Sequence, residues 1–327
     1  MEQNLKNQEN SFYNFFDKNK ILKIWQLIQK YKNITLLTHF RPDGDGISAC
    51  AAIDKILHDM GKNVETIYPN KSQFQFKREP KNLLINTHRQ IPELLIILDC
   101  ATYNRIYYPE IFKQVPIINI DHHISNNIDG TYNLIHAQSS STCEILFYFF
   151  KILDKNLIDK YVAECLLFGI LYDSQVFHTQ AVTPNTLIAS AGLMEFGANL
   201  YKLKTELISN KNPKIIALWG KMLSNIRITP SGKAAWTYIT QEDLKKYNIK
   251  QAPLIGFNNF LSQIAGIDIT LLFQEIDTGQ TKVSLRSKKT DVNKFAAKFG
   301  GGGHKNAAGI LSDKSIKELI KEITDKL

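Results

Sequence analysis

His39, Asp43 and Asp45 stand within seven positions of one another in the segment LLTHFRPDGDGISAC, residues 36–50. Turn chemistry accounts for Pro42 and the two glycines, but a turn does not require one imidazole and two carboxylates. Such side chains are ligands of divalent cations. An EF-hand calcium loop is excluded, because no third acid and no closing Glu follow in register. The segment is therefore a candidate metal site.

Side chains that can bind metals end three further apolar segments. Asp99 follows ELLIIL, Asp121, His122 and His123 follow VPIINI, and Asp173 ends YVAECLLFGILYD. A single acid after a strand is often only a turn residue or a helix cap. Four such segments, two of which contain histidine, favour a metal site instead. Because the carboxyl ends of parallel strands border the ligand crevice of an open sheet, we expect these side chains to meet at one edge.

The number and type of these ligands predict two ions. Four carboxylates and two imidazoles are too many for one tetrahedral zinc, and no thiolate pattern accompanies them. The set fits two octahedral ions, with manganese favoured over magnesium, a possible substitute, because imidazole takes part. Two ions that share a carboxylate, for which Asp99 is best placed, would activate a water for in-line attack on phosphorus. The predicted metal ligands are His39, Asp43, Asp45, Asp99, His122 and Asp173.

The elements around these residues predict an α/β fold. From residue 20 to about 190, helical spacing alternates with apolar runs of strand length, as at 20–31, 33–39 and 93–100. Runs without polar alternation suit a parallel sheet with helices on both faces. Ser141 and Glu144 form a candidate capping box before an apolar helix.

A smaller α/β domain is expected to follow, with a cleft between the two domains. The predicted divisions are a polar N-terminal extension (1–19), a large domain (20–199), a helical linker (200–225) and a C-terminal domain (226–327). In the C-terminal domain we expect strands at 234–240, 269–276, 282–288 and 307–312, and helices at 254–265, 291–299 and 315–326.

Composition is that of an ordinary globular protein with a basic excess. The formal net charge is +9, and residues 281–327 hold eleven Lys and Arg against five Asp and Glu, which would suit an anionic partner. No apolar run approaches the roughly 18 residues of a membrane span, and the N-terminus is too polar for a signal peptide. The cysteines, which show no CxxC spacing, are expected to be buried reduced thiols of a cytoplasmic protein. They are Cys50, Cys100, Cys143 and Cys165.

Five ordered motifs make the chain recognisable. They are HFRPDGDG, LDC followed by Arg105, DHH, YDS and FGGGGHKNAAG. Together they resemble the DHH phosphoesterase family, named for Asp-His-His, over residues 20–327, and the last motif looks like the DHH-associated C-terminal domain. The subgroup most similar in length and layout is the nanoRNase and pAp-phosphatase group. Its members remove nucleotides from very short oligonucleotides and dephosphorylate 3′-phosphoadenosine 5′-phosphate (pAp).

The resemblance implies roles for the candidate residues. Two manganese ions would be held by two groups that share Asp99: His39 and Asp43 with Asp99, and Asp45, His122 and Asp173 with Asp99. Asp121 would orient an imidazole from outside the metal ligands. His123 would donate to a non-bridging oxygen of the scissile phosphate.

The C-terminal domain is expected to hold the substrate. The glycines at 300–303 lie between a predicted helix and a predicted strand, where they would let backbone N–H groups approach an anion. Arg286 could bind a phosphate with two parallel hydrogen bonds. By the resemblance, the substrate-binding residues are Arg105, Arg286, Ser287, Gly302, Gly303 and His304.

The expected activity is manganese-dependent hydrolysis of di- to pentanucleotides of RNA or DNA to mononucleotides, of pAp to AMP, or of linear pApA. One alternative is a cyclic-dinucleotide phosphodiesterase. Another is a 5′–3′ exonuclease on long single strands, which needs an extended groove with stacking platforms that the sequence does not show. A family pyrophosphatase is disfavoured because its second domain lacks the GGGH motif. A non-catalytic regulator is disfavoured because every ligand position is filled. A homodimer is a further expectation.

Overall fold

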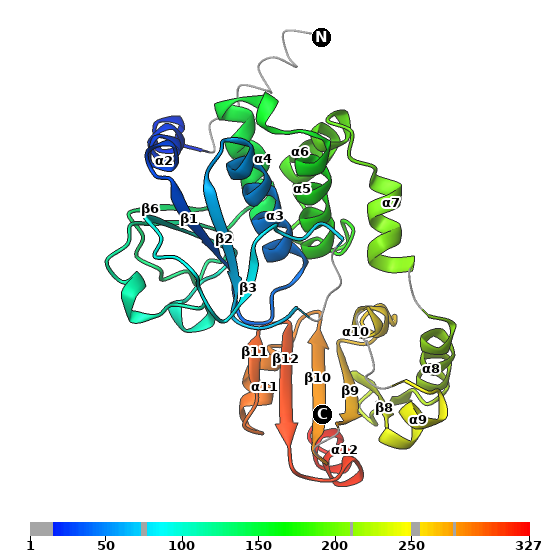
Figure 1. The fold of residues 1–327 in the computed structure, drawn as a ribbon. Coiled ribbons are helices and arrows are strands. Elements are labelled where there is room, and N and C mark those ends of the chain that lie inside the picture. Colours follow the sequence, from blue (N-terminus) through cyan, green and yellow to red (C-terminus); the bar gives the residue numbers. More distant parts are fainter. Residues whose placement is uncertain (1–15, 73–76, 210–211, 250–255, 277–278) are drawn as a thin grey trace. The chain divides into compact units, whose positions relative to one another are not determined.

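The computed structural model describes residues 16–72, 77–209, 212–249, 256–276 and 279–327 (Figure 1). The chain divides into two compact units, with the boundary between residues 209 and 210. This boundary falls inside the segment 200–225, which the sequence predicts as a helical linker. Each unit is built around its own sheet.

The first unit contains a six-stranded sheet in the order β3-β2-β1-β4-β5-β6. The strands are β1 (Asn33–Leu37), β2 (Asn63–Tyr68), β3 (Leu83–Ile85), β4 (Leu94–Leu98), β5 (Ile117–Asp121) and β6 (Tyr132–Ile135). All neighbouring strands are parallel, as the sequence predicts. From β1 the chain adds β2 and then β3 on one side, and it then returns to place β4 on the other side of β1. The β1–β4 border is therefore a topological switch point, where open sheets of this kind bind ligands.

The α-helices of this unit cover one face of the sheet (Figure 1). They are α2 (Lys18–Lys30), α3 (Gly44–Asp59), α4 (Thr142–Leu153), α5 (Lys160–Asp173), α6 (Pro184–Glu195) and α7 (Leu200–Lys204). Along β4, Leu94, Ile96 and Leu98 pack in the core with these helices, whereas Leu95 and Ile97 pack on the opposite side.

The opposite face of the sheet is covered by the β4–β5 connection, with two short 3-10 helices, η1 (Tyr103–Arg105) and η2 (Glu110–Phe112). The expected helices on both faces are thus unequal, because this connection forms only two short 3-10 helices. The unit also contains η3 (Lys155–Leu157) and a π-helical turn, η4 (Thr205–Ser209).

The predicted capping box at α4 forms in part. Ser141 is the N-cap, and its Oγ accepts a hydrogen bond from the N–H of Glu144 at 3.0 Å. The carboxylate of Glu144 turns instead to Ser140, whose N–H and hydroxyl donate to it, and to the hydroxyl of Thr186. Glu144 therefore fixes the segment before α4 to α6.

The second unit contains a mixed six-stranded sheet in the order β11-β12-β10-β9-β8-β7. Its strands are β7 (Arg227–Ile228), β8 (Ala234–Ile239), β9 (Ile269–Glu275), β10 (Thr281–Ser287), β11 (Gly302–His304) and β12 (Ala307–Ser312). Its helices are α8 (Pro213–Ser224), α9 (Gln241–Lys246), α10 (Phe257–Leu261), α11 (Val292–Ala297) and α12 (Ile316–Thr324). The helix expected at 254–265 is shorter, and residues 254 and 255 lie outside the described part of the chain.

All four cysteines are buried and unpaired, which confirms the prediction of free thiols. None of the helices within the described ranges combines the length and apolarity that a membrane span requires.

Candidate metal centre

Three neighbouring strands of the first sheet end in residues of the predicted site, two of them metal ligands and the third, Asp121, the residue expected to orient an imidazole. His39 lies two residues beyond β1, Asp99 directly follows β4, and Asp121 is the last residue of β5. Asp173 is different, because it is the last residue of helix α5 and not a strand end. Asp43 is the N-cap of α3, and its Oδ1 accepts hydrogen bonds from the first turn of that helix. A capping role and a metal-binding position therefore coincide at Asp43.

The folded chain brings all six predicted ligands together. Three groups of side chains have ligand atoms within 4.8 Å of one another: His39, Asp43 and Asp99; Asp45, His122 and Asp173; and Asp99, Asp121, His122 and His123. Asp99 and His122 each belong to two groups, so the groups form one continuous cluster. Carboxylate oxygens and imidazole nitrogens at this spacing could hold divalent cations.

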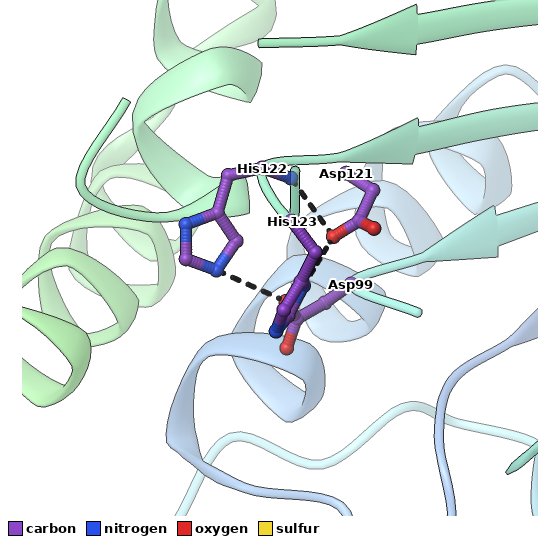
Figure 2. A group of neighbouring side chains, drawn as sticks. All are labelled: Asp99, Asp121, His122 and His123. Carbon is purple, nitrogen blue, oxygen red and sulfur yellow. Dashed lines mark hydrogen bonds and ion pairs between the residues drawn. The ribbon is translucent and has the colours of Figure 1, made fainter. Parts of the chain in front are cut away.

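Asp99 faces both sides of the cluster. Its Oδ2 lies 3.5 Å from Nε2 of His39. Its Oδ1 lies 3.5 Å from Nε2 of His122 (Figure 2). The side chain is only 2% exposed. Its backbone has a φ of +56°, a left-handed conformation that costs an L-residue about 1–2 kcal/mol. Asp99 thus presents one oxygen to each group, the orientation that a shared carboxylate needs.

The two histidines of the predicted ligand set turn the same nitrogen toward the cluster. Nδ1 of His39 lies 2.9 Å from the carbonyl of Phe40, and Nδ1 of His122 lies 3.3 Å from the carbonyl of Ser139. A carbonyl can only accept a hydrogen bond, so Nδ1 carries the proton and Nε2 is left for an ion. Nε2 of His122 also lies 3.2 Å from Oδ2 of Asp173. This arrangement fits a metal site.

Asp45 is completely buried against the start of α4. Its Oδ2 accepts a hydrogen bond from the N–H of Thr142 at 2.6 Å, and its Oδ1 accepts one from the N–H of Cys143 at 3.1 Å. The partial positive charge of a helix N-terminus stabilises a carboxylate there. A Cβ added to Gly169 of α5 would lie 2.7 Å from Oδ1 of Asp45, so this glycine makes the approach possible. Sequence reasoning missed Gly169, although an isolated glycine in an apolar helix is a signal for close packing.

Burial and mutual charge shift the pKa values of the cluster. Burial, reinforced by neighbouring carboxylates, raises the pKa of Asp45, and burial raises that of Asp173 to about 6. Burial opposes charge on the histidines as well, but the surrounding carboxylates outweigh it and raise the pKa of His39 to about 10 and of His122 to about 12. Burial likewise opposes charge on Asp99, but the two imidazoles hold its pKa well below the usual range. The cluster is a concentration of buried negative charge that requires protons or metal cations.

Asp121 fixes the last histidine of the motif. Its Oδ1 accepts hydrogen bonds from Nδ1 of His123 at 2.7 Å and from the N–H of His122 at 2.8 Å (Figure 2). Its Oδ2 accepts one from Nδ2 of Asn126 at 2.6 Å. Asp121 therefore orients the imidazole of His123 rather than that of His122. Asn126, which also donates to the carbonyl of Cys100, was not identified from the sequence.

Arg105 lies beside the cluster, in η1. Its Nη2 is 3.2 Å from Nδ1 of His39, and Arg105 is exposed. Because that Nδ1 donates to Phe40, a second donor there makes no hydrogen bond. The guanidinium has donors left for another acceptor, and its predicted contact with substrate stays a prediction.

The predicted substrate residues of the second unit gather at one end of its sheet. Arg286 on β10 and His304 on β11 are each in register with Ala307 of β12. Arg286 is half-buried, which lowers its pKa, and its Nη1 donates to the carbonyl of Leu285 at 2.9 Å. Ser287 donates its hydroxyl to the carbonyl of Thr290. The side chain of His304 lies outside the described residues.

The N–H groups of the glycines at 300–303 form hydrogen bonds mainly within the second unit. The N–H groups of Gly300, which has a φ of +72°, and Gly301 donate to carbonyls of the last turn of α11 in the pattern that ends helices. The N–H of Gly303 donates to Oδ1 of Asn293 at 2.8 Å. The expectation that the run offers its N–H groups to an anion is therefore wrong for these three glycines, because each N–H is already bonded within the unit.

A parallel sheet with a cluster of carboxylates and imidazoles at its switch point, followed by a separate mixed-sheet unit, defines a two-unit α/β protein with a candidate metal centre. Residues 33–170 match the DHH family, N-terminal domain, and residues 231–327 match the DHHA1 domain. The chain therefore combines a DHH-family N-terminal domain with a DHHA1 domain.

Relatives match over nearly their full length. A Streptococcus mutans protein named "Probable bifunctional oligoribonuclease and PAP phosphatase NrnA" is 26% identical, over 87% of this chain and 91% of the relative. A Mycoplasma genitalium protein named "Bifunctional oligoribonuclease and PAP phosphatase NrnA" is 25% identical, over 95% and 98%. The crystal structure of an exopolyphosphatase-related protein from Bacteroides fragilis superposes with a TM-score of 0.87 at 24% identity, over 95% of this chain and 97% of that chain. This last similarity shows the shared fold.

Proposed function

We propose that this protein is a metal-dependent phosphoesterase that hydrolyses short oligonucleotides to mononucleotides and pAp to AMP. The observation that carries the proposal is Asp99, which turns one carboxylate oxygen toward each of two groups of metal-competent side chains. The names of relatives that align over most of both chains support the substrate class. The basic excess of the chain suits an anionic substrate.

The metal centre is proposed to hold two manganese ions, for which magnesium is a substitute. One ion would be held by His39, Asp43 and Asp99, and the other by Asp45, Asp99, His122 and Asp173. The mixture of imidazole and carboxylate favours manganese. Such ions, when bound, supply positive charge to phosphoryl oxygens and lower the pKa of water.

His123 is proposed to stabilise charge on the substrate. The hydrogen bond from its Nδ1 to Asp121 raises its pKa, which favours the imidazolium form. Because Asp121 holds Nδ1, the donor left for substrate is Nε2. A fixed cationic donor lowers the energy of the negative charge that develops on a phosphoryl oxygen during hydrolysis. Asp121 acts on this step through the orientation of His123.

The second unit is proposed to bind the nucleotide. Arg286 would form charge-assisted hydrogen bonds with a phosphate. Arg286 and His304 lie on the two strands that flank β12, and both pair with Ala307 of that strand. Ser287 and Gly302 belong to the same end of the sheet. So does Gly303, whose N–H donates to Asn293 and where an added Cβ would lie 2.4 Å from the carbonyl oxygen of Ala307. The domain limits 20–199 and 226–327, a homodimer and a cytoplasmic location belong to the same proposal.

A substrate panel at fixed manganese concentration tests the proposal. It contains pAp, pApA, cyclic di-AMP, and RNA and DNA of two to twenty-four nucleotides, with the Asp99→Asn variant as the inactive control. We expect pAp and the di- to pentanucleotides to be hydrolysed fastest. Faster hydrolysis of the 24-mers would favour a long-strand exonuclease, and preference for cyclic di-AMP would favour a cyclic-dinucleotide phosphodiesterase. No hydrolysis of any member would refute the proposal.

A further inference from the structure

Thr142 contacts two carboxylates of the cluster at once. It is the first residue of α4 and is completely buried. Its Oγ1 donates to Oδ1 of Asp99 at 3.2 Å, and its N–H donates to Oδ2 of Asp45 at 2.6 Å. Asp99 belongs to the group with His39 and Asp43 and also to a group with His122, whereas Asp45 belongs only to the group with His122 and Asp173. One residue therefore connects the two sides of the candidate centre.

The hydroxyl of Thr142 restricts how Asp99 can bind ions. Each carboxylate oxygen accepts about two hydrogen bonds or ligand bonds through its lone pairs. The hydroxyl of Thr142 occupies one of the two lone pairs of Oδ1. The other lone pair remains for an ion, on the side where Nε2 of His122 lies 3.5 Å from Oδ1. Oδ2 stays directed toward Nε2 of His39. With the hydroxyl in place, Asp99 can offer one oxygen to each ion but cannot place both ions on Oδ1.

The backbone of Thr142 is itself held firmly. Ser141 caps α4, and the carboxylate of Glu144 binds the residue before the cap. On the other side, Asp45 packs closely against α5, because a Cβ added to Gly169 would lie 2.7 Å from its Oδ1. The N–H and the hydroxyl of Thr142 belong to one residue, and their separation depends only on the χ1 rotamer of its buried, β-branched side chain. Together they set the spacing between the carboxylates of Asp45 and Asp99.

We propose that Thr142 is a positioning residue that fixes the orientation of Asp99 and its spacing from Asp45, and thereby the spacing of the two ions. The inference rests on the proposed metal centre, and it adds a residue that touches neither substrate nor ion. Partners of metal ligands that act in this way typically change metal affinity about 10–100-fold when removed.

The test compares variants that separate the hydroxyl from the rest of the side chain. Thr142→Val removes the hydroxyl and keeps the shape and the N–H, whereas Thr142→Ser keeps the hydroxyl. Thr237→Val is the matched control, because Thr237 is also fully buried and donates its hydroxyl to the carbonyl of Met222 at 2.6 Å in the other unit. Thr142→Ala serves as a second hydroxyl-free variant should Thr142→Val fail to fold.

Manganese binding is measured by calorimetric titration, and the magnetic coupling between the two ions by electron paramagnetic resonance. We expect Thr142→Val to bind the second ion about tenfold more weakly and to change the coupling, with Thr142→Ser and Thr237→Val like the wild type. Unchanged affinity and coupling in Thr142→Val, or equal losses in Thr142→Ser, would overturn the inference while leaving the metal centre intact. Wild-type protein that binds fewer than two ions would overturn the metal centre itself and the inference with it.

Discussion

Replacement of Gly169 by alanine perturbs the candidate centre through packing alone. A Cβ at this position of α5 would lie 2.7 Å from Oδ1 of Asp45 and 2.3 Å from Sγ of Cys143. Neither neighbour is the free end of a flexible chain, because both are completely buried. The new methyl group must therefore displace Asp45, and with it a predicted metal ligand, or force α4 and α5 apart.

The stability cost of Gly169→Ala follows from two opposing effects. Overpacking a buried site costs about 1–3 kcal/mol, and alanine is favoured over glycine in a helix by about 1 kcal/mol. The expected net loss is about 0–2 kcal/mol. Gly220 of α8 provides a matched control, because a Cβ there would meet nothing within 4 Å. Gly220→Ala should therefore gain up to about 1 kcal/mol of unfolding free energy.

The assay combines urea unfolding with manganese titration and hydrolysis of pAp. We expect Gly169→Ala to lose about tenfold or more in manganese affinity and in kcat/KM, beyond what its stability predicts, and Gly220→Ala to keep both. Adding Cys143→Ala to Gly169→Ala should recover stability but not metal affinity, because the contact with Asp45 persists. Wild-type metal affinity and activity in Gly169→Ala would refute the reasoning that close packing fixes Asp45.

Three further predictions address the cluster and the second unit. Asp99→Asn should lower hydrolysis of every substrate at least about a hundredfold, since it removes the shared charge; activity above that level would refute the shared role. Arg286→Ala should raise KM for pAp and dinucleotides but spare bis-p-nitrophenyl phosphate; equal losses on both would place Arg286 in the chemistry. The raised pKa values of His39 (about 10) and His122 (about 12) keep both imidazoles protonated in the metal-free protein at neutral pH, so manganese must displace these protons. Affinity should therefore rise with pH from about 6 to about 9, and calorimetry in two buffers should detect proton release; binding without proton release would contradict this.

The residues of the candidate centre were predictable because a simple rule places them. Parallel strands end at one edge of a sheet, so His39, Asp99 and Asp121 had to be neighbours once β1, β4 and β5 were adjacent. Asp173 was predicted because it ends an apolar segment, and in the structure that segment is helix α5. Its place in the cluster depends on how α5 packs, which periodicity does not specify.

The residues that support the centre could not be found in this way. Thr142 and Asn126 act through single contacts made by tertiary packing, and neither carries a motif. The N–H groups of Gly300, Gly301 and Gly303 were misjudged, because a sequence shows where N–H groups can approach an anion but not which acceptors within the protein they already bind. The end of α11 and the side chain of Asn293 engage these three groups.

Anomalous diffraction at the manganese edge, from crystals grown with manganese, tests the central claim most directly. Two peaks are predicted, one among His39, Asp43 and Asp99 and the other among Asp45, His122 and Asp173, with one oxygen of Asp99 on each ion. A single peak, or manganese bound away from these side chains, would contradict the account.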